Sequence, residues 1–169
     1  LFDLPTNMTY KLIKADVRNI SKILLPEKID VVVHLAAFTN PSISHKDPDN
    51  FMKHNLECTE NIANFCVTNG SKLIYVSSTS IYSKSANNIQ EDCSNDHISG
   101  QTPYAKSKIL EEEIVSRLAS SHKSESTILR FGTIYGKSPG MRFHTAVNKF
   151  CWEAAIGNTC KIWSTALNQ

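Results

Sequence analysis

The stretch IDVVVHLAA, residues 29–37, decides the fold. Its centre is a β-branched run that suits a strand buried on both faces, and it passes directly into the small residues Ala36 and Ala37. Such strands are typical of parallel sheets, whose ligands bind at the carboxyl ends of the strands. The stretch therefore predicts a strand over residues 29–35 that opens onto a ligand site.

Strand-like and helix-like patterns alternate on both sides of this stretch. Further short strands are predicted over residues 10–15, 72–77 and 126–130. Helices are predicted over residues 48–69, from Thr102 and Pro103 onward, and over residues 142–156, where Gly157 closes the last one. The polar residues 78–100 predict a loop beside the site. This alternation predicts an α/β fold with a Rossmann-like, doubly wound and mainly parallel sheet. The helix after Pro103 is expected to bury Ile109, Leu110, Ile114, Val115 and Leu118.

Composition sets the broad class of the protein. The 169 residues are 41% hydrophobic and 20% charged, which is ordinary for one globular domain. The net charge of +2 comes without a run of five or more like charges, which argues against a nucleic-acid partner. The longest apolar stretch, residues 31–38, is shorter than the roughly 20 residues that span a bilayer. We therefore expect a cytoplasmic protein that is not bound to a membrane.

The five cysteines argue against a metal site. They lie neither in a CxxC pair nor at zinc-ligand spacing with a histidine, so we expect reduced thiols and no bound metal. The cysteines are Cys58, Cys66, Cys93, Cys151 and Cys160.

Tyr104 and Lys108 are the residues with the clearest chemical potential. They lie four apart at the start of a predicted helix, so their side chains share one face. A free tyrosine has a pKa near 10 and is a poor base at neutral pH unless a cation favours the phenolate. We expect Lys108 to supply that cation and the Ser78 hydroxyl to add a hydrogen bond to the substrate oxygen or the phenolate. The alternative is an exposed tyrosine and lysine on an ordinary helix, because YxxxK often occurs by chance.

Tyr104 and Lys108 belong to a series of four motifs that follow one another along the chain. These are VVVHLAA (residues 31–37), SSTSIY (77–82), PYAKSK (103–108) and LRFGTIYG (129–136). Together they resemble the extended short-chain dehydrogenase/reductase family, of the NAD-dependent sugar-nucleotide epimerase/dehydratase type, from about residue 14 to residue 163. The resemblance implies that Tyr104 is the catalytic base or acid, that Lys108 is its partner and also holds the nicotinamide ribose, and that Ser78 is the catalytic serine.

The resemblance also implies contacts to a cofactor, NAD or alternatively NADP, and to a nucleotide-sugar substrate. Asp16 is expected beside the adenine, the backbone after the strand beside the pyrophosphate, and Asn55 in support of the site through a hydrogen bond across it. The implied cofactor-binding residues are Asp16, Leu35, Ala36, Ala37, Asn55, Ser77, Tyr104, Lys108, Phe131 and Gly132. The implied substrate-binding residues are Ser78, Thr79, Tyr104 and Thr133.

Several of these residues also have a purely structural interpretation. Ala36 and Ala37 are small enough merely to allow close packing, Asn55 suits a helix surface, and Asp16 suits a turn. His34 is expected to be a satisfied strand-end residue rather than a ligand.

The sequence departs from the family pattern at both ends. The family's glycine-rich turn, GxxGxxG, is absent, so we expect the first βαβ unit and most of the C-terminal substrate-binding part to lie outside this chain. Residues 1–157 would then be a partial NAD(P)-binding domain with the catalytic residues, and residues 158–169 the start of the substrate-binding part. The chain alone is expected to be inactive, and the full-length protein to be a homodimer.

The resemblance implies NAD-dependent epimerisation of a nucleotide sugar. Tyr104 would take the proton from a sugar hydroxyl while the same carbon gives a hydride to NAD, and the hydride would return to the other face. The first alternative is an NADPH-dependent reductase of a 4-keto nucleotide sugar. The second is a non-catalytic NAD(P)-binding scaffold or sensor. Elimination of water is not expected, because Thr79 and Ser80 stand where related 4,6-dehydratases carry an Asp-Glu pair.

Overall fold

The computed structural model describes residues 9–23, 25, 28–39, 41–83, 89–93, 97–143 and 145–161, without the side chains of residues 41–43. The chain divides into two compact units. Residues 12–132 form the larger unit, and residues 133–169 belong to the smaller one together with residues 1–11. The predicted domain boundary after residue 157 stays a prediction, because residues 162–169 lie outside the described part.

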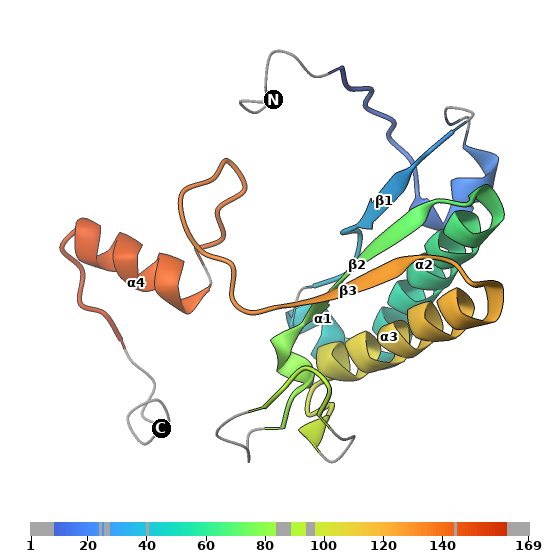
Figure 1. The fold of residues 1–169 in the computed structure, drawn as a ribbon. Helices are drawn as coiled ribbons and strands as arrows, with labels where there is room; N and C mark the ends of the chain where they lie inside the picture. Colours follow the sequence, from blue (N-terminus) through green and yellow to red (C-terminus); the bar gives the residue numbers. More distant parts are fainter. Residues whose placement is uncertain are drawn as a thin grey trace. The chain divides into compact units, whose positions relative to one another are not determined.

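The larger unit is built on a parallel sheet. Its strands are β1 (Val31–His34), β2 (Lys72–Ser78) and β3 (Ser126–Phe131), in the order β1-β2-β3. Val31 pairs with Lys72 and Ser78 pairs with Phe131, both in parallel register. The predicted parallel sheet of an α/β fold is therefore confirmed. Because the strands run the same way, their carboxyl ends lie at one end of the unit, together with the start of α3 (Figure 1).

Two long helices, α2 (Pro48–Asn69) and α3 (Pro103–His122), pack side by side against the sheet (Figure 1). α2 ends at Gly70, whose φ of 66° is left-handed and suits a residue without Cβ. α3 begins as predicted: the Thr102 hydroxyl accepts a 3.1 Å hydrogen bond from the Ala105 N–H, and Pro103 takes the first helical position.

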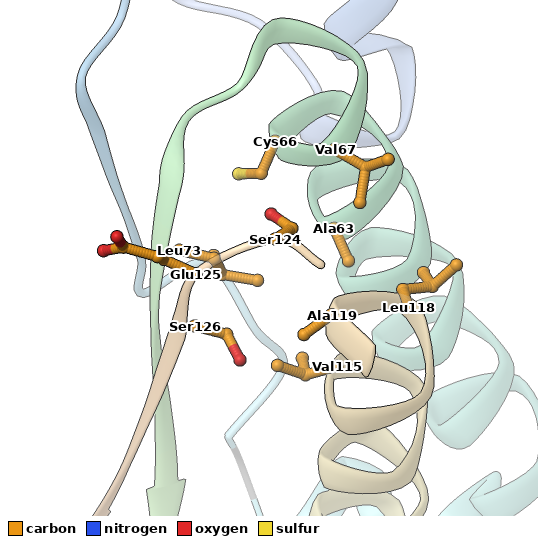
Figure 2. A pocket seen from close by; sticks show the side chains of 10 residues that line it. All are labelled: Ala63, Cys66, Val67, Leu73, Val115, Leu118, Ala119, Ser124, Glu125 and Ser126. Atoms are coloured by element: carbon orange, nitrogen blue, oxygen red, sulfur yellow. The ribbon is translucent and has the colours of Figure 1, made fainter. Parts of the chain in front are cut away.

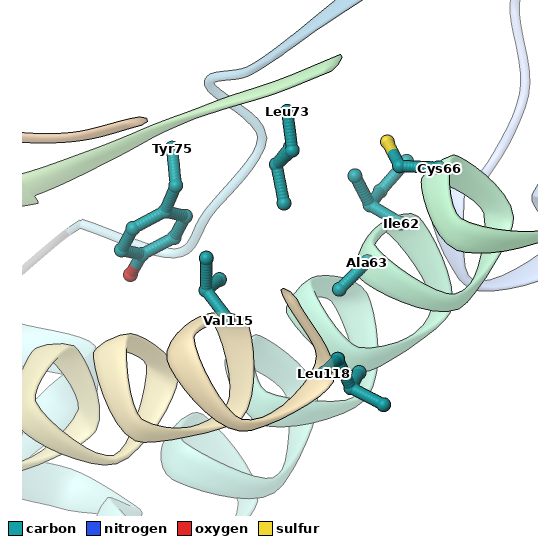
Figure 3. Close-up of a cluster of buried hydrophobic side chains, with 7 residues drawn as sticks. All are labelled: Ile62, Ala63, Cys66, Leu73, Tyr75, Val115 and Leu118. Atoms are coloured by element: carbon teal, nitrogen blue, oxygen red, sulfur yellow. The ribbon is translucent and has the colours of Figure 1, made fainter. Parts of the chain in front are cut away.

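The apolar core lies between the two helices and one face of the sheet. On β2 the side chains of Leu73, Tyr75 and Ser77 are buried in strict alternation. The core cluster, drawn in Figure 3, consists of Ile62, Ala63, Cys66, Leu73, Tyr75, Val115 and Leu118. In that view the Tyr75 hydroxyl points toward α3.

A shallow pocket opens at the amino ends of β2 and β3, at the other end of the strands from the predicted site (Figure 2). Core residues of α2 and α3 make up much of its wall. The lining residues are Ala63, Cys66, Val67, Leu73, Val115, Leu118, Ala119, Ser124, Glu125 and Ser126. The pocket is lined in large part by residues of the apolar core, and none of the predicted site residues lines it.

The strand predicted over residues 10–15 is wrong. This segment has no regular structure and leads into a 3-10 helix, η1 (Val17–Lys22). A strand needs a neighbour to bond its N–H and C=O groups, and no described residue pairs with this segment. Tyr10 and Leu12 are accordingly 62% and 79% exposed. A short helix that the sequence did not suggest, α1 (Pro41–Lys46), precedes α2.

The buried face of α3 also differs from the prediction. Leu110, expected inside, is 38% exposed, and Ile109 and Ile114 are only partly buried. Polar side chains take their place, because they find partners inside the unit. The buried residues of α3 are Ala105, Ser107, Lys108, Glu111, Glu112, Val115 and Leu118.

The predicted loop after β2 is largely irregular where it is described. It begins with a 3-10 turn, η2 (Thr79–Ile81), and its ends meet in a bridge between Tyr82 and Ile98, while residues 84–88 and 94–96 lie outside the described part. In the smaller unit, α4 (Ala146–Ala155) begins four residues later than predicted, and Gly157 follows it with a left-handed φ of 75°. None of the helices in the described segments has the length and apolarity that crossing a membrane requires.

Candidate active site

The fold brings most of the predicted site residues to the carboxyl end of the sheet. Each strand leads directly into a segment that contains predicted site residues, and Tyr104 lies in the first turn of α3. The residues that end or follow the strands are Leu35, Ala36 and Ala37 after β1, Ser78 and Thr79 at the end of β2, and Phe131 and Gly132 at the end of β3. Thr133 begins the smaller unit, so its substrate contact stays a prediction.

Tyr104 and Lys108 lie near each other at the start of α3, while their catalytic roles stay a prediction. The Lys108 Nζ lies 5.9 Å from the centre of the Tyr104 ring. Tyr104 is partly exposed, while Lys108 is only 4% exposed. Tyr104 lies in the first turn of α3, and the start of a helix carries partial positive charge.

The Lys108 ammonium faces the interior. Its Nζ donates to the Tyr75 hydroxyl at 3.0 Å, to the Val76 carbonyl at 3.2 Å and to the Glu111 carboxylate at 3.2 Å. These partners match the three N–H groups of an ammonium. Lys108 must therefore release one of them to bind a ribose hydroxyl, and that contact stays a prediction.

Glu111 is a residue that sequence reasoning missed. Its side chain is fully buried and accepts hydrogen bonds from Thr59 at 2.8 Å, Tyr75 at 2.8 Å and Ser107 at 2.6 Å, besides Lys108. The signal was its position: it lies four residues before the buried Val115, so it shares the inner stripe of α3. Its place in a run of three glutamates hid this role, because such a run suggests a solvated face.

His34 closes the same network from β1. The Thr59 hydroxyl gives its proton to Glu111, so its oxygen accepts from the His34 Nε2–H, 3.3 Å away. The pKa of His34 is lowered from 6.5 to about 4, mainly because burial disfavours the charged ring; Glu111 opposes this shift and Lys108 adds to it. His34 is thus a neutral, hydrogen-bonded residue at the strand end.

The two serines at the end of β2 differ in what they bond. Ser78 Oγ accepts a 3.2 Å hydrogen bond from the Ser80 N–H and so caps η2, and a hydroxyl that accepts can also donate its own proton. Ser77 is 2% exposed, and its hydroxyl has no hydrogen-bond partner among the described residues. A buried hydroxyl without a partner is costly, so Ser77 is suited to a ligand that supplies one.

Asn55 is a fully buried residue of α2, not a surface residue. Its Oδ1 accepts from the Phe38 N–H at 2.8 Å and its Nδ2 donates to the Phe38 carbonyl at 3.1 Å. The amide therefore holds the backbone just after β1. The cofactor contact predicted for Asn55 stays a prediction, because this arrangement uses its amide for support.

Arg130 and Glu112 are a second pair that sequence reasoning missed. Arg130 binds Glu112 through Nε at 3.0 Å and Nη2 at 2.7 Å, a forked geometry that favours the ion pair. Its Nη1 donates to the Tyr82 hydroxyl at 2.9 Å and to the Glu91 carbonyl at 3.0 Å. The pair raises the pKa of Arg130 and joins the loop after β2 to β3 and α3.

Asp16, predicted beside the adenine, is held by Arg18. Its carboxylate accepts from the Arg18 Nη2 at 2.6 Å and the Arg18 N–H at 2.9 Å, and these bonds lower the pKa of Asp16 to about 2. The cofactor contact of Asp16 stays a prediction.

All five cysteines are free thiols. Burial raises the pKa of the Cys58 thiol to about 11, so this side chain packs as a neutral group. Across the described ranges, no three His, Cys, Asp or Glu side chains come together in a way that would hold a metal ion.

Asn55→Asp tests the support of the segment after β1. The change keeps the shape but removes the N–H that meets the Phe38 carbonyl, so we expect a loss of about 2 kcal/mol in the free energy of unfolding at pH 7. The control is Asn64→Asp at an exposed position of α2, which should change it by less than about 0.5 kcal/mol. If urea unfolding gave the same loss for Asn55→Asp and Asn64→Asp, Asn55 would not be the residue that supports the segment after β1.

His34→Gln tests the neutral histidine through its pH dependence. Between pH 6.5 and about 4 the unfolded chain binds a proton at His34 that the folded chain excludes, so native stability falls as the pH falls. Glutamine can still donate to Thr59 but does not titrate. The stability of the native protein relative to the variant should therefore fall across this interval by on the order of 2 to 3 kcal/mol. If urea unfolding gave the same difference in unfolding free energy between the native protein and the variant at pH 7 and at pH 4.5, the assignment of a neutral His34 would be wrong.

Comparisons with known proteins identify the family and agree with the fold. A family model described as "NAD dependent epimerase/dehydratase family" matches residues 3–169. A curated dTDP-D-glucose 4,6-dehydratase from Dictyostelium discoideum is 30% identical over 152 residues, which are 84% of this chain and 35% of that protein.

Two solved structures share the fold. UDP-glucuronic acid 4-epimerase from Bacillus cereus, in complex with UDP-glucuronic acid and NAD, is 24% identical with a TM-score of 0.70, over 88% of this chain and 45% of that one. dTDP-4-dehydrorhamnose reductase from Yersinia enterocolitica is 26% identical with a TM-score of 0.66, over 79% of this chain and 44% of that one. The chain thus spans between about a third and a half of the length of these relatives. Since the family model covers nearly all of its residues, the chain belongs to the NAD dependent epimerase/dehydratase family.

Proposed function

We propose that this chain is the cofactor-binding and catalytic part of an enzyme that epimerises a nucleotide sugar with NAD. The observation that carries the proposal is the position of Tyr104, in the first turn of α3 with the Lys108 ammonium 5.9 Å from its ring. This surrounding favours the phenolate that proton abstraction from a sugar hydroxyl needs.

The residues at the strand ends fit a dinucleotide. The backbone after β1 is exposed at Leu35 and Ala36, where small or outward-facing side chains leave the main chain accessible to a ligand. The buried hydroxyl of Ser77 has no partner among the described residues, as expected of a group that a cofactor satisfies. We propose that these residues, with Lys108, hold NAD.

The residues of the proposed site divide the steps of the reaction between them. NAD, when bound, supplies the hydride acceptor and donor. Tyr104 removes the proton of the sugar hydroxyl and later returns it, and Lys108 stabilises its phenolate. The Ser78 hydroxyl, whose oxygen already accepts from the Ser80 N–H, donates to the sugar oxygen.

Thr79 and Ser80 favour hydride chemistry without elimination. Both side chains are exposed directly after Ser78, and neither carries a carboxyl group that protonates a leaving hydroxyl near neutral pH. In this respect we propose that the chain differs from the 4,6-dehydratase to which it is similar. An NADPH-dependent reductase is the second candidate, and the likeness to the dehydrorhamnose reductase supports it.

Product analysis tests the reaction type. The full-length protein, incubated with NAD and UDP-, GDP- or dTDP-hexoses, should give an epimer of one of them. It should give a reduced sugar only if a 4-keto sugar and NADPH are supplied. Loss of one water, seen by mass spectrometry as a 4-keto-6-deoxy product, would overturn the proposal, because Thr79 and Ser80 offer no acid for that step.

Tyr104→Phe tests the acid/base role. Removing the hydroxyl should lower kcat of the full-length enzyme by about 100-fold or more and leave the Kd for NAD within a few fold, because only the proton transfer is lost. Tyr10→Phe is the control, since it also removes one tyrosine hydroxyl, from a side chain that is 62% exposed in a segment without regular structure. A Tyr104→Phe enzyme as active as Tyr10→Phe would show that another group moves the proton.

A further inference from the structure

Lys108 and Glu111 form a buried ion pair next to the proposed site. The Lys108 Nζ is 3.2 Å from the Glu111 Oε2, and the two side chains are only 5% and 1% exposed. A buried ammonium is costly unless an anion and further acceptors compensate for the lost water. Glu111 therefore decides whether the Lys108 ammonium can remain in this place.

The Glu111 carboxylate is itself fixed from several sides. Ser107 donates to Oε1, while Thr59 of α2 and Tyr75 of β2 donate to Oε2, at distances between 2.6 and 2.8 Å. Rotation of the carboxylate would break bonds to three different elements at once. The anion is thus a rigid reference point within the unit.

Glu111 holds the ammonium by two routes. The direct contact is the ion pair, and the indirect one passes through Tyr75, whose oxygen accepts from the Lys108 Nζ at 3.0 Å while its proton goes to Glu111. Every donor in this chain of bonds faces an acceptor, so no hydrogen atoms conflict.

We infer that Glu111 is a positioning residue for the proposed reaction: it fixes the Lys108 ammonium beside Tyr104 without touching sugar or cofactor. The inference rests on the proposed function. The neighbouring Glu112 is buried to a similar degree, at 8% exposure, but it binds Arg130. The two glutamates can therefore be separated by experiment.

A double-mutant cycle on the full-length enzyme tests the inference. Glu111→Gln should lower kcat by about tenfold when Lys108 is present, and by less than about twofold in a Lys108→Met background, because no ammonium is left to position. The same cycle read in the Kd for NAD should show the same non-additivity, and it remains measurable where turnover is very low. Glu112→Gln is the control and should cause equal fold losses in both backgrounds.

Tyr75→Phe is the second variant, in case Glu111→Gln does not fold. It removes only the indirect route, so its loss in kcat should be smaller and should again vanish in the Lys108→Met background. Equal fold losses with and without Lys108, for either variant, would overturn the inference while the proposed function stands. A native enzyme that neither binds NAD nor turns over any nucleotide sugar would instead overturn the proposed function, and the inference with it.

Discussion

The burial of one carboxylate constrains how the larger unit is assembled. Glu111 has no access to water and needs donors in place of it. Those donors come from α2, β2 and α3, so the three elements must meet in a single register. Leaving such a group without a partner costs several kcal/mol, which is a large part of a domain's net stability. The requirement therefore selects one arrangement of helices and sheet.

The same constraint connects the core to the candidate site. Tyr75 belongs to both, because its ring packs in the apolar cluster while its hydroxyl bonds Glu111 and Lys108 (Figure 3). The amino-terminal half of β2 is thus held by apolar packing and its carboxyl-terminal half by hydrogen bonds. Dispersion forces tolerate small shifts, whereas hydrogen bonds to a fixed anion lose strength quickly with distance and angle. The Tyr75 hydroxyl and the Val76 carbonyl accordingly join the carboxyl-terminal half of β2 to Glu111 and Lys108 of α3.

The sequence predicted those features that depend on local pattern. The β-branched runs predicted all three strands to within two residues at each end, and the apolar spacing with the Asn-Gly stop predicted α2 from Pro48 to Asn69. The prediction of a strand over residues 10–15 failed because a strand forms only where another strand pairs with it, and the local sequence does not show whether such a partner is present. The spacing of Tyr104 and Lys108 predicted that they lie near each other, for the same local reason. It did not predict that Lys108 turns inward, because the partners that hold it there are far away in the sequence. Tyr75, which binds Lys108, lies 33 residues before it, and Thr59, which binds Glu111, lies 52 residues before that glutamate.

Side chains of α2 and β3 position the backbone around the site. Asn55 binds both peptide groups of Phe38 and so fixes the segment after β1, and Arg130 fixes the loop after β2 through Tyr82 and Glu91. Loops at the ends of strands are mobile unless such bonds hold them, since their backbone groups otherwise bond to water. A parallel sheet offers a ligand only its strand ends, and the precision of those ends must come from residues beneath them. In this chain that support comes from α2 and α3, whose buried polar residues lie beside the apolar residues that pack on the sheet.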